Sequence, residues 1–215
     1  MKKIKYIAFI LILALGIIGG AYAYWTDSTE IDGTVSTGSM TAKWEDFFIR
    51  DAASGHHSPA EVPEYVTAEA FIDPNDSKKA IIIISNLYPS GSSDERVAVT
   101  GHVVVDGTIP SKFDEAVLTI NTDDNDVADW VKVDMRVAVR RDGTWTVLLD
   151  ESGVALEDVD DEINKAASDV VLQPGDAIGF GDETLYFYLD SNAPNSVQGS
   201  TLEFELEMKF KQFNM

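Results

Sequence analysis

The sequence predicts an all-β protein, a two-sheet jelly-roll sandwich with one short helical insertion at about residues 155–167. Residues 202–210 (LEFELEMKF) alternate apolar and charged side chains without a break, and residues 131–140 (VKVDMRVAVR) largely do the same. This period of two is typical of a strand with one buried and one solvated face. Many short strands separated by Gly and Pro turns favour two packed antiparallel sheets.

The remaining elements follow from shorter patterns, which bring the expected total to about seven to nine strands. Asp142-Gly143 predicts a tight turn that joins residues 131–140 to 144–149 as a hairpin. Gly101 is a candidate β-bulge. The helix is expected because residues 155–167 are acidic at the start and contain neither Pro nor Gly. Other strands are expected at 79–85 (KAIIIIS, apolar enough to be buried on both faces), 96–106, 116–120 and 183–189, and an irregular loop at 51–64.

The N-terminus has the layout of a secretory signal peptide. Three lysines within the first five residues precede an apolar run, and small residues follow at Ala21-Tyr22-Ala23. The predicted signal-peptidase site comprises Ala21, Ala23 and Tyr24, with cleavage after Ala23. An uncleaved membrane anchor is the alternative, although the apolar run is short for a stable span. We therefore predict three parts: a signal peptide at 1–23, a leading segment at 24–37 and a jelly-roll domain at 38–215.

The charge balance is strongly acidic, and this excludes some partners. The chain has 16 Lys+Arg against 37 Asp+Glu, a formal net charge of −21. Loss of the three signal-peptide lysines makes it −24. Such a chain repels nucleic acid and anionic lipid, so membrane contact is expected only through an uncleaved signal peptide. The chain has no cysteine, so disulfides cannot stabilise it.

No catalytic residue, metal site or cofactor is predicted. The three histidines are His56, His57 and His102, and none belongs to a His-Glu-x-x-His motif, which would place two zinc-binding imidazoles on one helix face. Pro59 and Pro63 disfavour a helix beside the His pair. We therefore interpret that pair as part of a solvated loop.

Two groups of residues could be mistaken for sites. The acidic run at 123–126 lacks the Gly and closing Glu of an EF-hand, so weak incidental cation binding is the alternative to a solvated loop. A second acidic group is interpreted as the solvent face of the helix and comprises Asp158, Asp160, Asp161 and Glu162. Aromatic side chains in the expected strands are interpreted as core rather than as a carbohydrate platform: Tyr186, Phe187, Tyr188, Phe204, Phe210 and Phe213.

Several short motifs together resemble one known family. They are GGAYAYWTDS at 19–28, STGSM at 36–40, NLYP at 86–89, LQPGD at 172–176 and NSVQGS at 195–200, followed by the final alternating strand. In this order the chain resembles the TasA/camelysin family of secreted proteins of Gram-positive bacteria. It departs from the family where Pro89-Ser90-Gly91 stands in place of Pro-Gly-Asp.

The resemblance implies a secreted jelly-roll subunit of extracellular biofilm matrix fibres, located in the matrix or at the cell surface. It implies a SipW-type signal peptidase during export and other copies of the same chain as partners. Family fibres grow by donor-strand complementation, in which the mature N-terminus of one subunit fills a gap in the sheet of the next. Residues 24–37 would then be the donor strand, with Tyr24, Trp25, Thr26, Ile31, Thr34 and Val35 as its main contact residues.

Other interpretations remain open. Residues 24–37 are rich in β-branched side chains and long enough to lie along a sheet edge, but they could instead form the first strand of their own domain. Because some family members are described as metalloendopeptidases, a camelysin-like secreted protease is one alternative function. A surface adhesin or binding module that does not polymerise is another.

Overall fold

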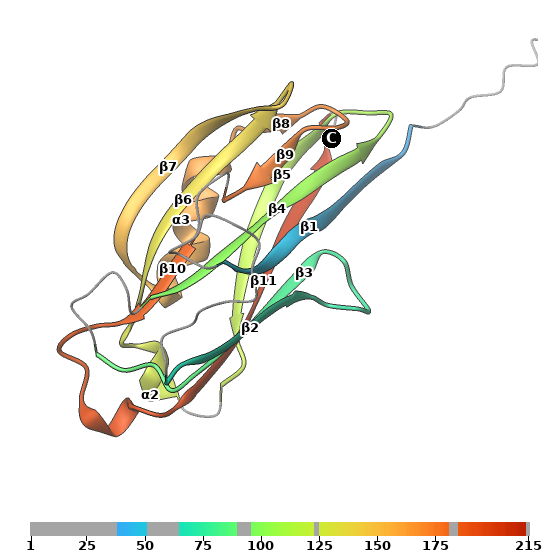
Figure 1. Cartoon of the computed structure of the whole chain (residues 1–215). Coiled ribbons are helices and arrows are strands. Elements are labelled where there is room, and N and C mark those ends of the chain that lie inside the picture. The colour runs from blue at the N-terminus through green and yellow to red at the C-terminus, as the bar shows by residue number, and fades with distance from the viewer. Residues whose placement is uncertain (1–37, 51–64, 90–95, 123–124, 181–184, 214–215) are drawn as a thin grey trace, which may run out of the picture. The chain divides into compact units, whose positions relative to one another are not determined.

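The computed structural model describes residues 38–50, 65–89, 96–122, 125–180 and 185–213, and its strands form two antiparallel sheets (Figure 1). The first sheet has the order β1 (Met40–Arg50), β4 (Val97–Gly107), β10 (Leu185–Leu189), β6 (Val131–Arg141) and β7 (Thr144–Ala155), with β9 (Ala177–Gly179) between β4 and β6. The second has the order β2 (Thr67–Ile72), β3 (Lys79–Ser85), β11 (Thr201–Gln212), β5 (Ser111–Ile120) and β8 (Val171–Leu172).

The chain crosses repeatedly between the two sheets. β2 and β3 form a hairpin in the second sheet, β4 returns to the first, β5 lies in the second, and the β6–β7 hairpin returns to the first. The predicted all-β jelly-roll sandwich is confirmed. The helical insertion is confirmed as well: a 3₁₀ turn, η2 (Leu156–Asp158), leads into α3 (Val159–Ala167). Two further short helical segments are α2 (Asn125–Ala128) and η3 (Asn195–Val197).

The core lies between the inner faces of the two sheets. On β11, Leu202, Phe204, Leu206 and Met208 are all fully buried, as the alternation predicted. The ring of Phe204 packs against that of Phe187 on β10, in the opposite sheet, with 5.2 Å between their centroids. Burial of each such side chain contributes about 1.5–3 kcal/mol, so these contacts hold the sheets together.

The aromatic prediction is correct only in part. Phe187 and Phe204 are core residues, and Phe210 is half-buried against the core. Tyr188 lies on the other face of β10, where its hydroxyl donates to Asp134 Oδ1 (3.2 Å). Phe213 is 51% exposed because it follows the last strand rather than belonging to it. Tyr186 is half-buried on the same face as Tyr188.

The strand predictions need three corrections. β3 is not buried on both faces, because Ile81 and Ile83 are half-buried while their neighbours in the strand are fully buried. β5 begins at Ser111 and β7 continues to Ala155, so both are longer than predicted. No residue pattern predicted the strands β1, β2, β8 and β9. A bulge interrupts the alternation of β1, β2 has alanine at two inward positions, and β8 and β9 are two and three residues long. Such segments carry little alternation for a sequence pattern to detect.

Gly101 lies opposite a β-bulge rather than in one. The register between β1 and β4 shifts between Glu45 and Phe48, so the extra residues belong to β1. A Cβ on Gly101 would lie 2.4 Å from the Phe47 ring. Glycine is therefore needed at 101, because the bulge places the Phe47 ring against the β4 backbone, where any side chain at 101 would clash with it.

The predicted β6–β7 hairpin is confirmed. Asp142 and Gly143 both have positive φ, 50° and 78°, as a two-residue type I′ turn requires. No helix among the described residues is long and apolar enough to cross a membrane.

Candidate functional site

The predicted assembly and processing residues lie outside the described residues, which begin at Gly38. The same holds for the His56-His57 pair and for Asp123 and Asp124. The predictions for them therefore stay predictions, as does the division at residues 23 and 37. The residues concerned are the signal-peptidase site Ala21, Ala23 and Tyr24 and the donor-strand residues Trp25, Thr26, Ile31, Thr34 and Val35.

His102 lies on the outer face of the first sheet, in an aromatic setting. Its ring meets the edge of Trp145, with 5.8 Å between the centroids, across the short strand β9. Gly179 of β9 pairs with His102, and a Cβ there would lie 2.7 Å from the His102 Cβ. The Arg140 guanidinium lies 5.5 Å from the centre of the Trp145 ring. Among the described residues, no hydrogen bond joins His102 to a serine or a carboxylate.

His102 should make the folded domain less stable in weak acid. Burial, followed by the positive charge of Arg140, lowers the pKa of His102 from its ordinary value of 6.5. The unfolded chain therefore binds this proton more readily, so stability is retained above about pH 6.5 and lost as pH falls toward the folded-state pKa. We expect His102→Gln to lose less stability than the natural chain between pH 7 and pH 5. Urea unfolding at each pH measures this difference, and parallel curves would contradict it.

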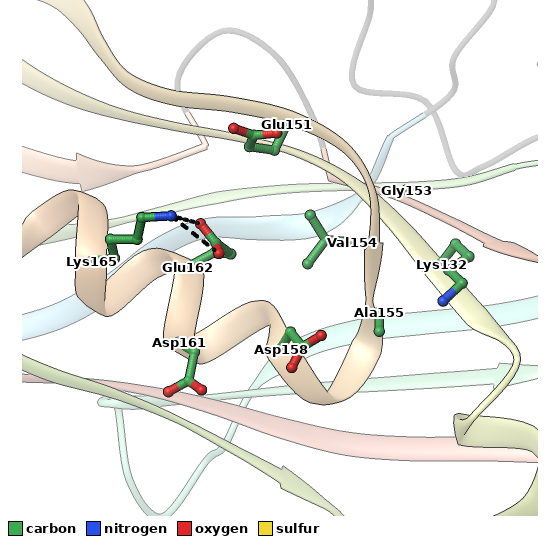
Figure 2. A pocket seen from close by; sticks show the side chains of 9 residues that line it. All are labelled: Lys132, Glu151, Gly153, Val154, Ala155, Asp158, Asp161, Glu162 and Lys165. Carbon is green, nitrogen blue, oxygen red and sulfur yellow. Dashed lines mark hydrogen bonds and ion pairs between the residues drawn. The ribbon is translucent and has the colours of Figure 1, made fainter.

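A polar cleft lies between the end of β7 and α3 (Figure 2), with a volume of about 650 Å³. Lys165 reaches Glu162, with 3.3 Å between Nζ and Oε2, and this is the ion pair drawn in the figure. Gly153, Val154 and Ala155 line the cleft together with six charged residues. The charged residues are the carboxylates Glu151, Asp158, Asp161 and Glu162 and the lysines Lys132 and Lys165.

The acidic residues of this cleft do not form a metal centre. No group of three His, Asp or Glu side chains in the described part of the chain is placed to hold a metal ion. The interpretation of the acidic group as a solvent face holds for Asp158 and Asp161, which are exposed. It is wrong for Asp160, whose Oδ2 accepts from the backbone N–H of Leu118 (3.0 Å). Asp160 therefore binds a strand of the second sheet rather than facing water.

This contact belongs to a larger feature: α3 covers the outer edge of β5. Asn164 bonds both polar groups of Ala116, accepting from its N–H at 2.6 Å and donating to its carbonyl at 3.0 Å. The N–H of Phe113 donates to the Val170 carbonyl, and β8 pairs with Ser111 and Lys112. A strand edge otherwise exposes a row of unpaired groups to other chains. At β5, the side chains of Asp160 and Asn164 on α3 hydrogen bond to these backbone groups.

The edge of β1 is bridged at its middle. The backbone N–H of Trp44 donates to the Ser77 carbonyl (2.8 Å), and its indole Nε1–H donates to the Lys78 carbonyl (2.9 Å). Both acceptors lie in the turn between β2 and β3, in the other sheet. Trp44 is 2% exposed and packs against Phe47 and Phe180. It therefore fastens the first sheet to the second along this side of the sandwich.

The edge of β7 is irregular and acidic. Its pairing with β6 shifts register twice, between Val133 and Met135 and between Val137 and Ala138. Asp150 and Glu151 lie on the strand, and the acidic cleft adjoins its end. Bulges and charges of this kind discourage the addition of another strand.

The edge of β2 differs from the other three. Among the described residues, only β3 hydrogen bonds to the backbone of β2, and the strand TAEAFI has Glu69 as its only charged side chain. Sequence patterns missed this strand. Its one signal is the alternation of Ala68, Ala70 and Ile72 with larger or polar residues, which is weak because alanine has a low preference for strands.

In comparisons with known proteins, no protein-family model matches the chain and no curated protein matches it.

Proposed function

We propose that this chain is a secreted structural subunit of extracellular biofilm matrix fibres. In this proposal, residues 24–37 of one copy complete a sheet of the next copy, and the copies join head to tail. The observation that carries the proposal is the edge of β2, whose backbone groups have no hydrogen-bonding partner other than β3 among the described residues. An open edge is what an added strand needs, because backbone hydrogen bonds supply the affinity.

Two properties of the sequence support this role. The chain has no cysteine, so disulfides cannot join the copies of a fibre. A donor strand and an acceptor edge are different surfaces, so the contact is heterologous, and it propagates into a filament when the rotation between copies does not close a ring. Cleavage after Ala23 by a SipW-type signal peptidase would release Tyr24 and the donor segment, so that polymerisation follows export.

Removal of residues 24–31 from the mature chain is expected to abolish filaments. The deletion takes away more than half of the donor segment and none of the described sandwich, so the circular dichroism spectrum and thermal unfolding should not change. Negative-stain electron microscopy measures filaments, and sedimentation measures the fraction of polymer. About 0.5 M NaCl should be included, because it screens repulsion between chains of formal charge −24.

A chain with His56→Ala and His57→Ala is the matched control. These substitutions lie outside the donor segment and should leave filament yield unchanged. Filaments of normal yield from the 24–31 deletion would overturn the proposal. The proposal would also be overturned if the natural mature chain formed no filaments over a wide range of protein concentration and pH.

A further inference from the structure

Exposed apolar side chains lie on both outer faces of the sandwich. Val147 on β7 is 45% exposed, and Phe71 on β2 is 37% exposed. Val147 pairs with Ala138, whose two neighbours on β6 are core residues, and Phe71 pairs with Ile81, whose two neighbours on β3 are core residues. Because neighbouring side chains of a strand point to opposite sides, Val147 and Phe71 point outward, one from each sheet.

On the first sheet, Val147 belongs to a group of aromatic and basic side chains. Val147 and His102 lie in one row across the sheet, which runs through β6 and β9. Arg140 and Trp145 are a cross-strand pair on the same face, with the guanidinium over the indole ring. We call His102, Arg140, Trp145 and Val147 the Trp145 patch.

The guanidinium of Arg140 has no carboxylate partner in the described part of the chain. Arg96, Arg136 and Arg141 each form an ion pair with an aspartate. The printed partner of Arg140 is the ring of Trp145, which leaves its N–H groups without an acceptor among the described residues. An arginine fork binds carboxylates well. The Trp145 patch therefore offers a cation and apolar surface to a second molecule.

On the second sheet, Phe71 belongs to a group of aliphatic and acidic side chains. Phe71 lies beside Ile81, and in the next row Ile83 lies between Glu69 and Glu203. Ile81 and Ile83 are half-buried. The carboxylates of Glu69 and Glu203 form no ion pair with a described residue, whereas Glu205 on the same face pairs with Lys79. We call Glu69, Phe71, Ile81, Ile83 and Glu203 the Ile83 patch.

The two patches complement each other. Each combines exposed apolar surface with charge that has no described partner, and the charges have opposite signs. They lie on the two opposite outer faces of one sandwich, so they cannot meet within one copy. A surface of this kind fits the opposite face of a second copy.

We propose that the Trp145 patch of one copy packs face to face against the Ile83 patch of a second copy, with Arg140 paired to Glu69 or Glu203. The contact goes beyond the proposed function, because it joins copies side by side rather than along a filament. Sheets that pack face to face lie about 10 Å apart with interdigitated side chains. At that spacing an arginine and a glutamate of facing sheets meet.

The contact is weak for a single pair of copies and strong for filaments. Each patch covers only a few strands, which places it at the small end of protein interfaces, so two free copies should separate. Along two filaments the same contact repeats many times, and linked contacts add to one another. The expected product is therefore a bundle of filaments, and in this respect the inference rests on the proposed function.

Charge reversal tests the pairing. Arg140→Glu should form filaments as the natural chain does, but bundles that sediment at low speed should fall about tenfold, because like charges then face each other. A chain with Glu69→Lys and Glu203→Lys should lose bundles in the same way. A chain that carries all three substitutions should regain them. Negative-stain electron microscopy counts filaments per bundle, and high-speed sedimentation measures total polymer.

Matched controls carry the same change of charge at positions outside both patches. Lys165→Glu corresponds to Arg140→Glu, and its side chain is 77% exposed on α3. Asp158→Lys with Asp161→Lys corresponds to the double glutamate change, and both residues are exposed. These controls should bundle as the natural chain does. Thermal unfolding checks that every variant folds.

A disulfide between filaments tests which faces meet, because the natural chain has no cysteine. Val147→Cys and Phe71→Cys chains, one of them with a tag, are polymerised separately, mixed and oxidised with diamide. We expect a mixed Val147–Phe71 dimer at least about tenfold more abundant than the dimer of Val147→Cys with Lys165→Cys. A predominance of Val147–Val147 or Phe71–Phe71 dimers would mean that like faces meet, and would overturn the inference.

The outcomes separate this inference from the proposed function. If the Arg140 and glutamate variants bundle as their controls do, the face-to-face contact is wrong and the fibre proposal stands. If both reversals abolish bundles and the triple variant does not restore them, the two patches do not face each other, and the inference is overturned. If the natural chain forms no filaments, the fibre proposal is overturned, and the same disulfide ratio on concentrated soluble chains decides the inference.

Discussion

Trp44→Ala should lower the free energy of unfolding by about 3–5 kcal/mol, the usual loss for a buried tryptophan truncated to alanine. The indole is 2% exposed and packs against the rings of Phe47 and Phe180, at 5.1 and 5.9 Å between centroids. Its N–H also satisfies the Lys78 carbonyl in the other sheet. The substitution thus removes core volume and one of the ties between the sheets. Urea unfolding measures the loss, and the melting temperature should fall on the order of 10 °C.

Trp44→Phe separates the two contributions. Phenylalanine retains much of the ring packing but has no N–H for the Lys78 carbonyl. We expect it to lose about 1–2 kcal/mol, within the range for a hydrogen bond whose partner is left unsatisfied. The backbone bond from Trp44 to Ser77 is unchanged in both variants. Equal losses for the two variants would show that packing of the indole contributes nothing beyond its hydrogen bond, contrary to the geometry.

Asn164→Ala should destabilise the domain by about 2–3 kcal/mol and also make it self-associate. The side-chain amide bonds both the N–H and the carbonyl of Ala116, and alanine leaves two partly buried groups without those partners. The uncovered stretch of β5 then resembles an ordinary strand edge, which other chains can extend. Thermal unfolding measures the first effect. Light scattering against protein concentration, with the donor segment deleted, measures the second.

Lys165→Ala is the matched control on the same helix. The Lys165 side chain is 77% exposed and pairs only with Glu162, three residues earlier, among the described residues. Exposed pairs of this kind contribute at most about 0.5 kcal/mol, so this variant should unfold almost as the natural chain does and stay monomeric without its donor segment. If Lys165→Ala and Asn164→Ala behave alike, the helix stabilises the domain through its position alone and the Asn164 bonds to β5 contribute nothing.

The variants at Trp44 and Asn164 address the same physical problem at two different strand edges. A two-sheet sandwich ends in four strand edges, and each must be paired, covered or interrupted to stay soluble. Here a tryptophan bridges one edge, a helix covers another, and bulges with carboxylates interrupt a third. Among the described residues the β2 edge has none of these features, which is why we propose that an added strand pairs there.

The sequence alone determined the strands with strong alternation and the tight turns between them. β11 and β6 were predicted because buried and solvated faces alternate along them, and the β6–β7 turn because Asp142-Gly143 favours positive φ. It also determined the acidic charge and the absence of disulfides. These properties are local, since each depends on a side chain's own chemistry or on neighbours a few residues away.

The tertiary structure alone decided what happens at the edges. Asp160 was interpreted as part of the solvent face of the helix, yet Asp160 and Asn164 both bond to β5, more than 40 residues away in the chain. Gly101 needed its small size because of a bulge in another strand. Nothing in TAEAFI indicates that the outer backbone groups of β2 would have no hydrogen-bonding partner among the described residues. Side-chain patterns specify which face of a strand is buried, whereas the partners of its backbone groups depend on which distant segment the fold places alongside.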